Sequence, residues 1–207
     1  MNRRKYILSI LLSLICTFCL YGQSTTAYSR TGQTGGVDER WDSHSCKYSN
    51  YSYGIGWNLP SELEWKRESG DEKHTIFRAI GGPFLVFINA QPVNPNADLW
   101  DIYPQYIKLQ EKVADLTEKQ SGVITYERTN EKVILFGKHA IKTTFKQYFK
   151  DDRFDEAVEL YAEEYSMIRN GYTIRMSIKV DNDTHYTKEC TDYIKKITQG
   201  IILTVGK

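Results

Sequence analysis

The chain has 207 residues, of which 27 are basic and 26 are acidic, so its formal net charge at pH 7 is +1. Binding to nucleic acid or to an anionic membrane surface depends on a concentrated basic patch, and this even balance provides no basis for either partner. Hydrophobic residues make up 41% of the sequence and charged residues 26%, which is typical of a globular domain and not of a disordered chain.

The N-terminus has the pattern of a secretory signal peptide. Arg3, Arg4 and Lys5 precede the apolar run of residues 6–20, and small residues follow. A membrane-spanning helix needs about 20 apolar residues, so this run favours a signal peptide over residues 1–22 that is cleaved after Gly22. Cys16 and Cys19 follow large residues, which argues against a lipid anchor.

Cleavage would leave a periplasmic or secreted protein with no membrane span. Removal of the three basic residues lowers the basic count from 27 to 24 against 26 acidic residues, a net charge near −2. Residues 23–40 are rich in Ser, Thr, Gly and Gln without an apolar period, which predicts a flexible leader. Residues 41–207 suffice for one domain.

Aromatic residues alternate in the stretch YSYGIGWNLPSELEW, residues 51–65. Tyr51, Tyr53, Ile55 and Trp57 would share one face of a strand, which fits either a stacking platform for a ligand or a buried sheet face. The mixture of aromatic and aliphatic side chains favours the buried face. Trp65 lies outside this register beside charged residues, so we expect it to be partly exposed.

The middle of the chain predicts a hairpin, a helix and three strands. Residues 74–80 and 84–91 flank Gly-Gly-Pro, and the apolar second segment predicts a central strand. A helix capped by Asn96 or Asp98 would run to about Lys119 and stop at Ser121-Gly122. Strands are expected over residues 123–129, 132–136 and 140–150.

The last third contains the clearest hairpin signal in the sequence. Two alternating segments, residues 156–168 and 172–180, flank Asn170-Gly171, a dipeptide that accepts positive φ. Asp183 or Thr184 would cap a closing helix with an apolar stripe. Strands followed by a helix, more strands and a helix predict an α+β domain built on an antiparallel sheet. The stripe comprises Tyr186, Cys190, Ile194, Ile197 and Ile201.

The order of these elements resembles the PsbP/DcrB-type fold family. The similar segments are IGWNLPSELEW, TIFRAIGGPFLVFINAQ, a helix opening on Asn-Ala-Asp-Leu, FGKHAIKTTFKQYF and a hairpin carrying Tyr-Thr-Ile-Arg, and together they span residues 50–204. The resemblance implies an antiparallel sheet sandwiched by helices. It also implies docking on a protein partner without chemistry of its own, as in extrinsic photosynthetic subunits, bacterial envelope proteins and a Ran-binding import factor.

Two cysteines would survive cleavage, Cys46 and Cys190. With His44 and His185 they make a zinc-like donor set, but neither pair has a finger or knuckle spacing, so no metal or other cofactor is expected. In an oxidising compartment a Cys46–Cys190 disulfide is favoured over two buried thiols; it would close a long loop and contribute roughly 4–5 kcal/mol.

Carboxylates are concentrated in residues 151–164. Asp151, Asp152, Asp155 and Glu156 predict a solvated loop, with weak calcium binding as the alternative. On the following strand, Glu159 and Glu163 are expected to pair with Lys142 and Lys146 across the sheet. No nucleophile elbow, phosphate loop or dinucleotide motif is found, so an enzyme is not expected.

Three functions follow from these patterns. The first is an exported, non-enzymatic module that docks on a protein of the cell envelope. The second is a small-ligand-binding protein with a pocket between the helix of residues 97–119 and the sheet, rimmed by Trp100, Tyr103 and Tyr106. The third is a carboxylate-dependent hydrolase, which requires two carboxylates that converge in a concave site.

Overall fold

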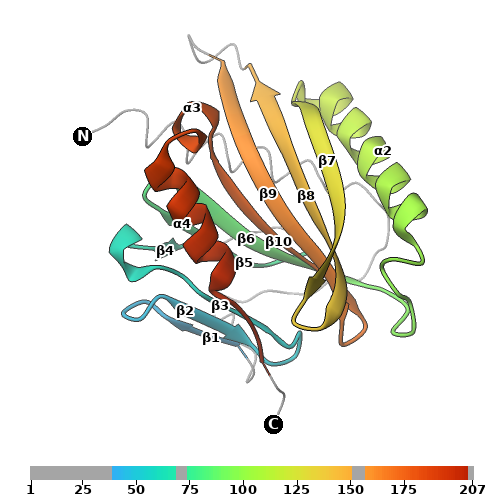
Figure 1. Ribbon diagram of the computed structural model, residues 1–207, viewed down its shortest axis with the longest axis horizontal. Helices are drawn as coiled ribbons and strands as arrows, with labels where there is room; N and C mark the ends of the chain where they lie inside the picture. Colours follow the sequence, from blue (N-terminus) through green and yellow to red (C-terminus); the bar gives the residue numbers. More distant parts are fainter. Residues whose placement is uncertain (1–38, 69–73, 151–156, 205–207) are drawn as a thin grey trace.

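The structure is a computed structural model that describes residues 39–68, 74–150 and 157–204, and it contains two antiparallel sheets and three helices within these ranges (Figure 1). The large sheet has seven strands in the order β4-β5-β6-β10-β9-β8-β7, and the small sheet has four in the order β1-β2-β3-β11. The α+β class with antiparallel sheets, predicted from the sequence, is therefore confirmed.

The large sheet consists of β4 (Lys66–Arg67), β5 (Thr75–Gly81), β6 (Phe84–Pro92), β7 (Ile124–Leu135), β8 (Lys138–Phe149), β9 (Val158–Arg169) and β10 (Tyr172–Asp181). The small sheet consists of β1 (Glu39–Asp42), β2 (Lys47–Asn50), β3 (Ile55–Asn58) and β11 (Ile201–Leu203). The helices are α2 (Tyr103–Ser121), α3 (Asn182–His185) and α4 (Lys188–Gln199), and a single 3-10 turn, η1, spans Ser61–Leu63.

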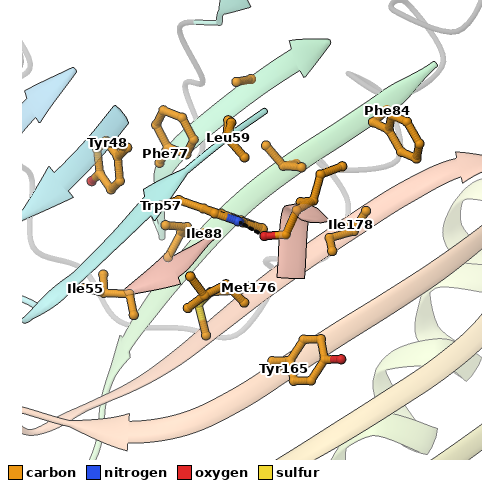
Figure 2. Close-up of a cluster of buried hydrophobic side chains, with 14 of the residues drawn as sticks. Tyr48, Ile55, Trp57, Leu59, Phe77, Phe84, Ile88, Tyr165, Met176 and Ile178 are labelled. Atoms are coloured by element: carbon orange, nitrogen blue, oxygen red, sulfur yellow. Dashed lines mark hydrogen bonds between the residues drawn. The ribbon is translucent and has the colours of Figure 1, made fainter. Parts of the chain in front are cut away.

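The main core lies between the large sheet, the small sheet and α4. Trp57 of β3 is fully buried in it, and its indole Nε1 donates a hydrogen bond to the carbonyl of Ile197 on α4 at 2.7 Å (Figure 2). Tyr48 of β2 stacks on Phe77 of β5 with ring centroids 4.1 Å apart. One face of the large sheet is thus covered by a small sheet together with α4, which differs from the expected layer of helices alone.

The aromatic stretch that precedes the core forms a turn and then a strand. Residues 51–54 are a turn with Gly54 at φ +68°, and β3 begins only at Ile55. Ile55 and Trp57 are fully buried, as expected if they lie on a buried sheet face and not on a stacking platform. The expectation for Trp65 was wrong: it is 4% exposed, and its Nε1 donates to the carbonyl of Pro60 at 2.8 Å.

The central segment differs from the prediction in its boundaries. The helix begins at Tyr103, so neither Asn96 nor Asp98 is its cap, and it ends at Ser121, followed by Gly122 with φ +68°. The strands expected over residues 123–129 and 132–136 form one strand, β7, and no turn interrupts it at Asn130-Glu131. In place of that turn, the register shifts between Tyr126 and Thr129, so two residues oppose Phe145 of β8.

The C-terminal third contains the predicted hairpin, but its closing helix differs from the prediction, and neither Asp183 nor Thr184 is a cap. Asn170 and Gly171 both have positive φ and join β9 to β10. The closing helix is divided: Asp181 caps the short α3, and the Thr187 hydroxyl accepts from the Cys190 amide at the start of α4. The last residue of the expected stripe, Ile201, belongs to β11, and the first, Tyr186, is 66% exposed.

The small sheet is completed by two segments for which the sequence predicted no strand. Glu39 and Arg40, assigned to the flexible leader, already form β1, and Ile201–Leu203 pair with β3 as β11. Residues 1–38 lie outside the described residues, and so do the expected signal peptide and most of the leader. None of the helices in the described ranges has the length and apolar character that crossing a membrane requires.

Candidate functional site: a cleft between α2 and the large sheet

A cavity of about 160 Å³ lies between α2 and the large sheet. Along β10, Ile174 and Met176 belong to the main core, whereas Arg175 and Lys179 line the cavity. Because successive side chains of a strand point to opposite faces, the cavity is on the face opposite the main core. We call it the α2 cleft; its polar lining includes Tyr106, Gln110, Arg128, Glu164, Arg175 and Lys179.

The cleft exists because α2 does not seal this face with apolar side chains. Of the α2 residues, only Thr117 is fully buried, and Leu109 and Leu116 remain 57% and 41% exposed. Dry packing on this face includes a small cluster around Phe87 and Val123 and the fully buried Ile141 of β8. The helix lies beside β7 at one edge of the sheet (Figure 1), so a polar, partly open space remains between them.

Three cationic side chains and one carboxylate line the cleft. Lys179 is 5% exposed, and its Nζ donates to the Gln147 amide oxygen at 2.9 Å. Glu164 is 6% exposed and lies 3.6 Å from the Nε of Arg175. The guanidinium of Arg128 lies over the ring of Phe145, 5.5 Å from its centroid, and burial lowers the pKa of Arg128. The lining therefore has an excess of positive charge.

A hydrogen-bond network runs from α2 to the sheet at the centre of the cleft. The hydroxyls of Tyr106 and Ser166 are 2.6 Å apart, and the Gln110 amide donates to the Tyr106 hydroxyl at 2.9 Å. The Thr143 hydroxyl donates to the Asn130 side-chain oxygen at 2.8 Å. Burial raises the pKa of Tyr106, so the phenol is neutral and available as a hydrogen-bonding group.

Of the three aromatic residues expected at the pocket rim, only Tyr106 lines the cleft. The Trp100 indole donates to the carbonyl of Ala140 at 2.9 Å and stacks on His139 with centroids 3.8 Å apart. The Tyr103 hydroxyl donates to the carbonyl of Asn130 at 3.2 Å. Trp100 and Tyr103 thus attach the start of α2 to the β7–β8 hairpin.

The expected disulfide is not formed in the structure. Cys46 and Cys190 are free thiols that are 4% and 3% exposed, both within the main core. The Cys46 thiol lies 3.6 Å from the carbonyl of Ser43, and burial raises the pKa of Cys190 to about 11. Each cysteine therefore packs in the core as a small apolar residue, which is a common alternative to a disulfide.

The residues of the zinc-like set do not form a donor cluster. The His185 ring stacks on Tyr161 with centroids 3.6 Å apart, and the buried thiols belong to the core. Within the described ranges, no group of three or more His, Cys, Asp or Glu residues is arranged to hold a metal ion. The acidic loop considered for calcium, residues 151–156, lies outside those ranges.

The carboxylates of β9 each contact a different partner. Glu163 pairs with Lys142 at 3.0 Å, as expected, but Lys146 pairs with Glu127 at 2.7 Å, and Glu159 accepts from the Asn182 amide. As neighbours on one strand, Glu163 and Glu164 point to opposite faces of the sheet. The described carboxylates of β9 therefore do not converge as the hydrolase alternative requires.

Sequence reasoning missed the charged lining of the cleft. Arg175, Ser177 and Lys179 alternate with the apolar residues of β10, a pattern that normally indicates a solvent-exposed face. The sequence signal for an open cleft is the weak apolar stripe of residues 103–121. A helix with so few apolar side chains cannot cover a sheet face with a dry layer. A polar strand face beneath a polar helix face indicates a wet cleft.

Comparison with solved structures assigns the fold. The solution structure of cyanobacterial PsbP (CyanoP) from Synechocystis sp. PCC 6803 matches with a TM-score of 0.56 and 11% identity, over 84% of this chain and 98% of that chain. The domain therefore has a PsbP-like fold, in agreement with the resemblance seen in the sequence, and at this identity the likeness concerns the fold alone.

Two further structures are similar at a lower level. A crystal structure from Bacteroides thetaiotaomicron VPI-5482 matches with a TM-score of 0.47 and 12% identity, over 76% of this chain and 47% of that chain. LpqN of Mycobacterium tuberculosis, which is involved in cell envelope biogenesis, matches with a TM-score of 0.40 and 10% identity, over 72% of this chain and 83% of that chain. The sequence matches no protein-family model and no curated protein.

Proposed function

We propose that this domain is an exported, non-enzymatic ligand-binding protein and that the α2 cleft is its binding site. The observation that carries the proposal is a cavity of about 160 Å³ in which polar and charged side chains from α2 and five strands converge. A cavity of about 150 Å³ is enough to hold a benzene-sized ligand. Small-ligand sites combine such a concave space with a few positioned polar groups.

Export is supported by the sequence of residues 1–22, with basic residues, an apolar run and small residues in the order of a signal peptide. The proposed role is binding without catalysis, since the described carboxylates of β9 each have a separate partner, and Glu163 and Glu164 point to opposite faces of the sheet.

The test is a ligand-observed NMR screen of polar fragments with about six to twelve non-hydrogen atoms. The Ala114→Trp variant places an indole in the cleft, because Ala114 is part of its lining. The matched control is Gln105→Trp, at an exposed position of the same helix. We expect fragments that bind the wild type and the control and are lost with Ala114→Trp. Fragment binding that the Ala114→Trp variant leaves unchanged would refute the assignment of the site.

Protein docking in the envelope is a second candidate, and the tip of the β7–β8 hairpin favours it. Ile134 and Phe136 are 57% and 46% exposed there, and a partner with an apolar groove would cover them. Wild type and an Ile134→Ser, Phe136→Ser variant would be compared in cross-linking to purified envelope proteins of the source organism. Docking through this tip requires a cross-linked product that the double variant does not form.

A further inference from the structure

We infer that the ligand of the α2 cleft is a small organic oxyanion, a carboxylate or a phosphate ester, held by Arg128, Arg175 and Lys179. This inference rests on the proposed ligand-binding role of the cleft and adds the chemical class of the ligand. Four observations carry it: a buried lysine, a redirected arginine, the charge balance of the lining, and a buried acceptor.

The buried lysine is Lys179, which is 5% exposed. Its Nζ has the Gln147 amide oxygen at 2.9 Å and lies 5.4 Å from the centroid of the Phe87 ring. No carboxylate lies within 4 Å of this ammonium in the described part of the chain. Burial of a charge is costly unless an opposite charge offsets it. An anion in the cleft would provide that charge.

Arg128 is directed into the cleft by the irregularity of β7. Glu127 has φ +48°, and Glu127 and Arg128 together oppose Phe145 where the register shifts. Such a bulge redirects a side chain that regular pairing would place elsewhere. Glu127 pairs with Lys146 on the other face of the sheet, while the Nε of Arg128 is buried without a hydrogen-bond partner among the described residues.

The balance of charge in the lining favours an anion. Arg128, Arg175 and Lys179 face a single carboxylate, Glu164, so three positive charges are set against one negative charge. Because the cleft walls have a low dielectric constant, these charges act more strongly there than on an open surface. The planar guanidinium of arginine can also bind a carboxylate or a phosphate through two parallel hydrogen bonds.

The other residues that line the cleft indicate the chemical character of the rest of the ligand. The side-chain oxygen of Gln110 is buried without a donor in the described ranges, and an O–H or N–H of the ligand would satisfy it. Phe87 and Phe145 provide the apolar walls. With about 160 Å³ of space, a single ring that carries hydroxyl groups and one acidic group fits this description better than a long apolar chain.

The test compares four probes that share one pyranose ring by isothermal titration calorimetry at low ionic strength: glucuronate, glucose 6-phosphate, glucose and glucosamine. We expect at least one anion to bind about tenfold or more tightly than glucose, since hydrogen bonds to charged groups are the stronger ones. Tighter binding of glucuronate would identify a carboxylate ligand, and tighter binding of glucose 6-phosphate a phosphate ester. Affinity for the anion should fall as salt is added.

Two variants connect the effect to the cleft. Lys179→Met and Arg128→Met should each weaken anion binding about tenfold or more, whereas Lys138→Met, which removes an exposed charge at the start of β8, should leave it unchanged. Far-UV circular dichroism and amide NMR spectra establish that each variant is folded, and either variant alone suffices for the comparison.

Outcomes that overturn the inference are distinct from failure of the proposed function. Binding of glucose or glucosamine as tight as that of the anions, lost with Ala114→Trp, would retain the cleft as a binding site and refute the anionic ligand. The absence of binding by all four probes would also refute it. Anion binding that Ala114→Trp does not affect would refute the cleft itself.

Discussion

The buried indole of Trp57 provides a quantitative test of how α4 is held to the sheets. Replacement by Phe removes the hydrogen bond from Nε1 to the Ile197 carbonyl at 2.7 Å and leaves space where the second ring was. The lost bond contributes about 1 kcal/mol net, because the same carbonyl still accepts from the Gly200 amide at 3.1 Å and is not left unsatisfied. The lost ring atoms contribute about 2 kcal/mol more through transfer and cavity effects.

We therefore expect Trp57→Phe to lower the free energy of unfolding by about 3 kcal/mol. For a domain of this size that corresponds to a fall in Tm of about 6–12 °C. Urea titration followed by far-UV circular dichroism measures the difference.

The matched control for this measurement is Trp100→Phe. The Trp100 indole makes the same kind of bond, to the Ala140 carbonyl at 2.9 Å, but its ring is only half-buried, so a loss of about 1 kcal/mol is expected. If the two variants are equally destabilised, burial of the indole between α4 and β3 does not determine the loss of unfolding free energy, and our reasoning is wrong.

Three further predictions concern glycine, tyrosine and cysteine. Gly200→Ala should cost about 2–3 kcal/mol in urea titrations, because a Cβ there would collide with the backbone carbonyl of Asn58, whereas Gly122→Ala, with open space and φ +68°, should cost only about 1 kcal/mol. Thiol titration of denatured, unreduced protein should find Cys46 and Cys190 free, and a count of zero would contradict the structure. Burial raises the pKa of four tyrosines above the usual value of about 10, so their stabilising contribution is complete below pH 10 and is lost above it. Absorbance at 295 nm should show that four of the 15 tyrosines ionise only as the protein unfolds, and ionisation of all 15 in the folded protein near pH 10 would be the contrary result; the four are Tyr48, Tyr106, Tyr161 and Tyr165.

Much of the fold could be predicted because local signals specify it. Positive φ at Asn170 and Gly171 and the alternation on either side define the β9–β10 hairpin without any tertiary information. The stripe of Cys190, Ile194 and Ile197 likewise identifies the buried side of α4.

Elements that depend on distant partners could not be predicted. Ile201–Leu203 are only three residues long and form a strand because β3 is beside them. Trp65 is surrounded by charges in the sequence, but its ring lies against Gly81, where a side chain would not leave room. The weak apolar stripe of α2 indicates an open sheet face, but the charged lining of the α2 cleft also depends on the distance between α2 and the sheet, which no local pattern encodes.

The link between Trp57 and Ile197 also has a consequence for the order in which the protein is made. These residues are 140 positions apart, and β3 pairs with β11, which is synthesised after α4. At about 5–20 residues per second, synthesis of the chain from Trp57 to Ile197 takes roughly 7–28 s, and β3 has no β11 beside it before then. During that time the small sheet has an unpaired β3 edge and the main core lacks α4. Closure of the main core therefore cannot precede the synthesis of α4 and β11.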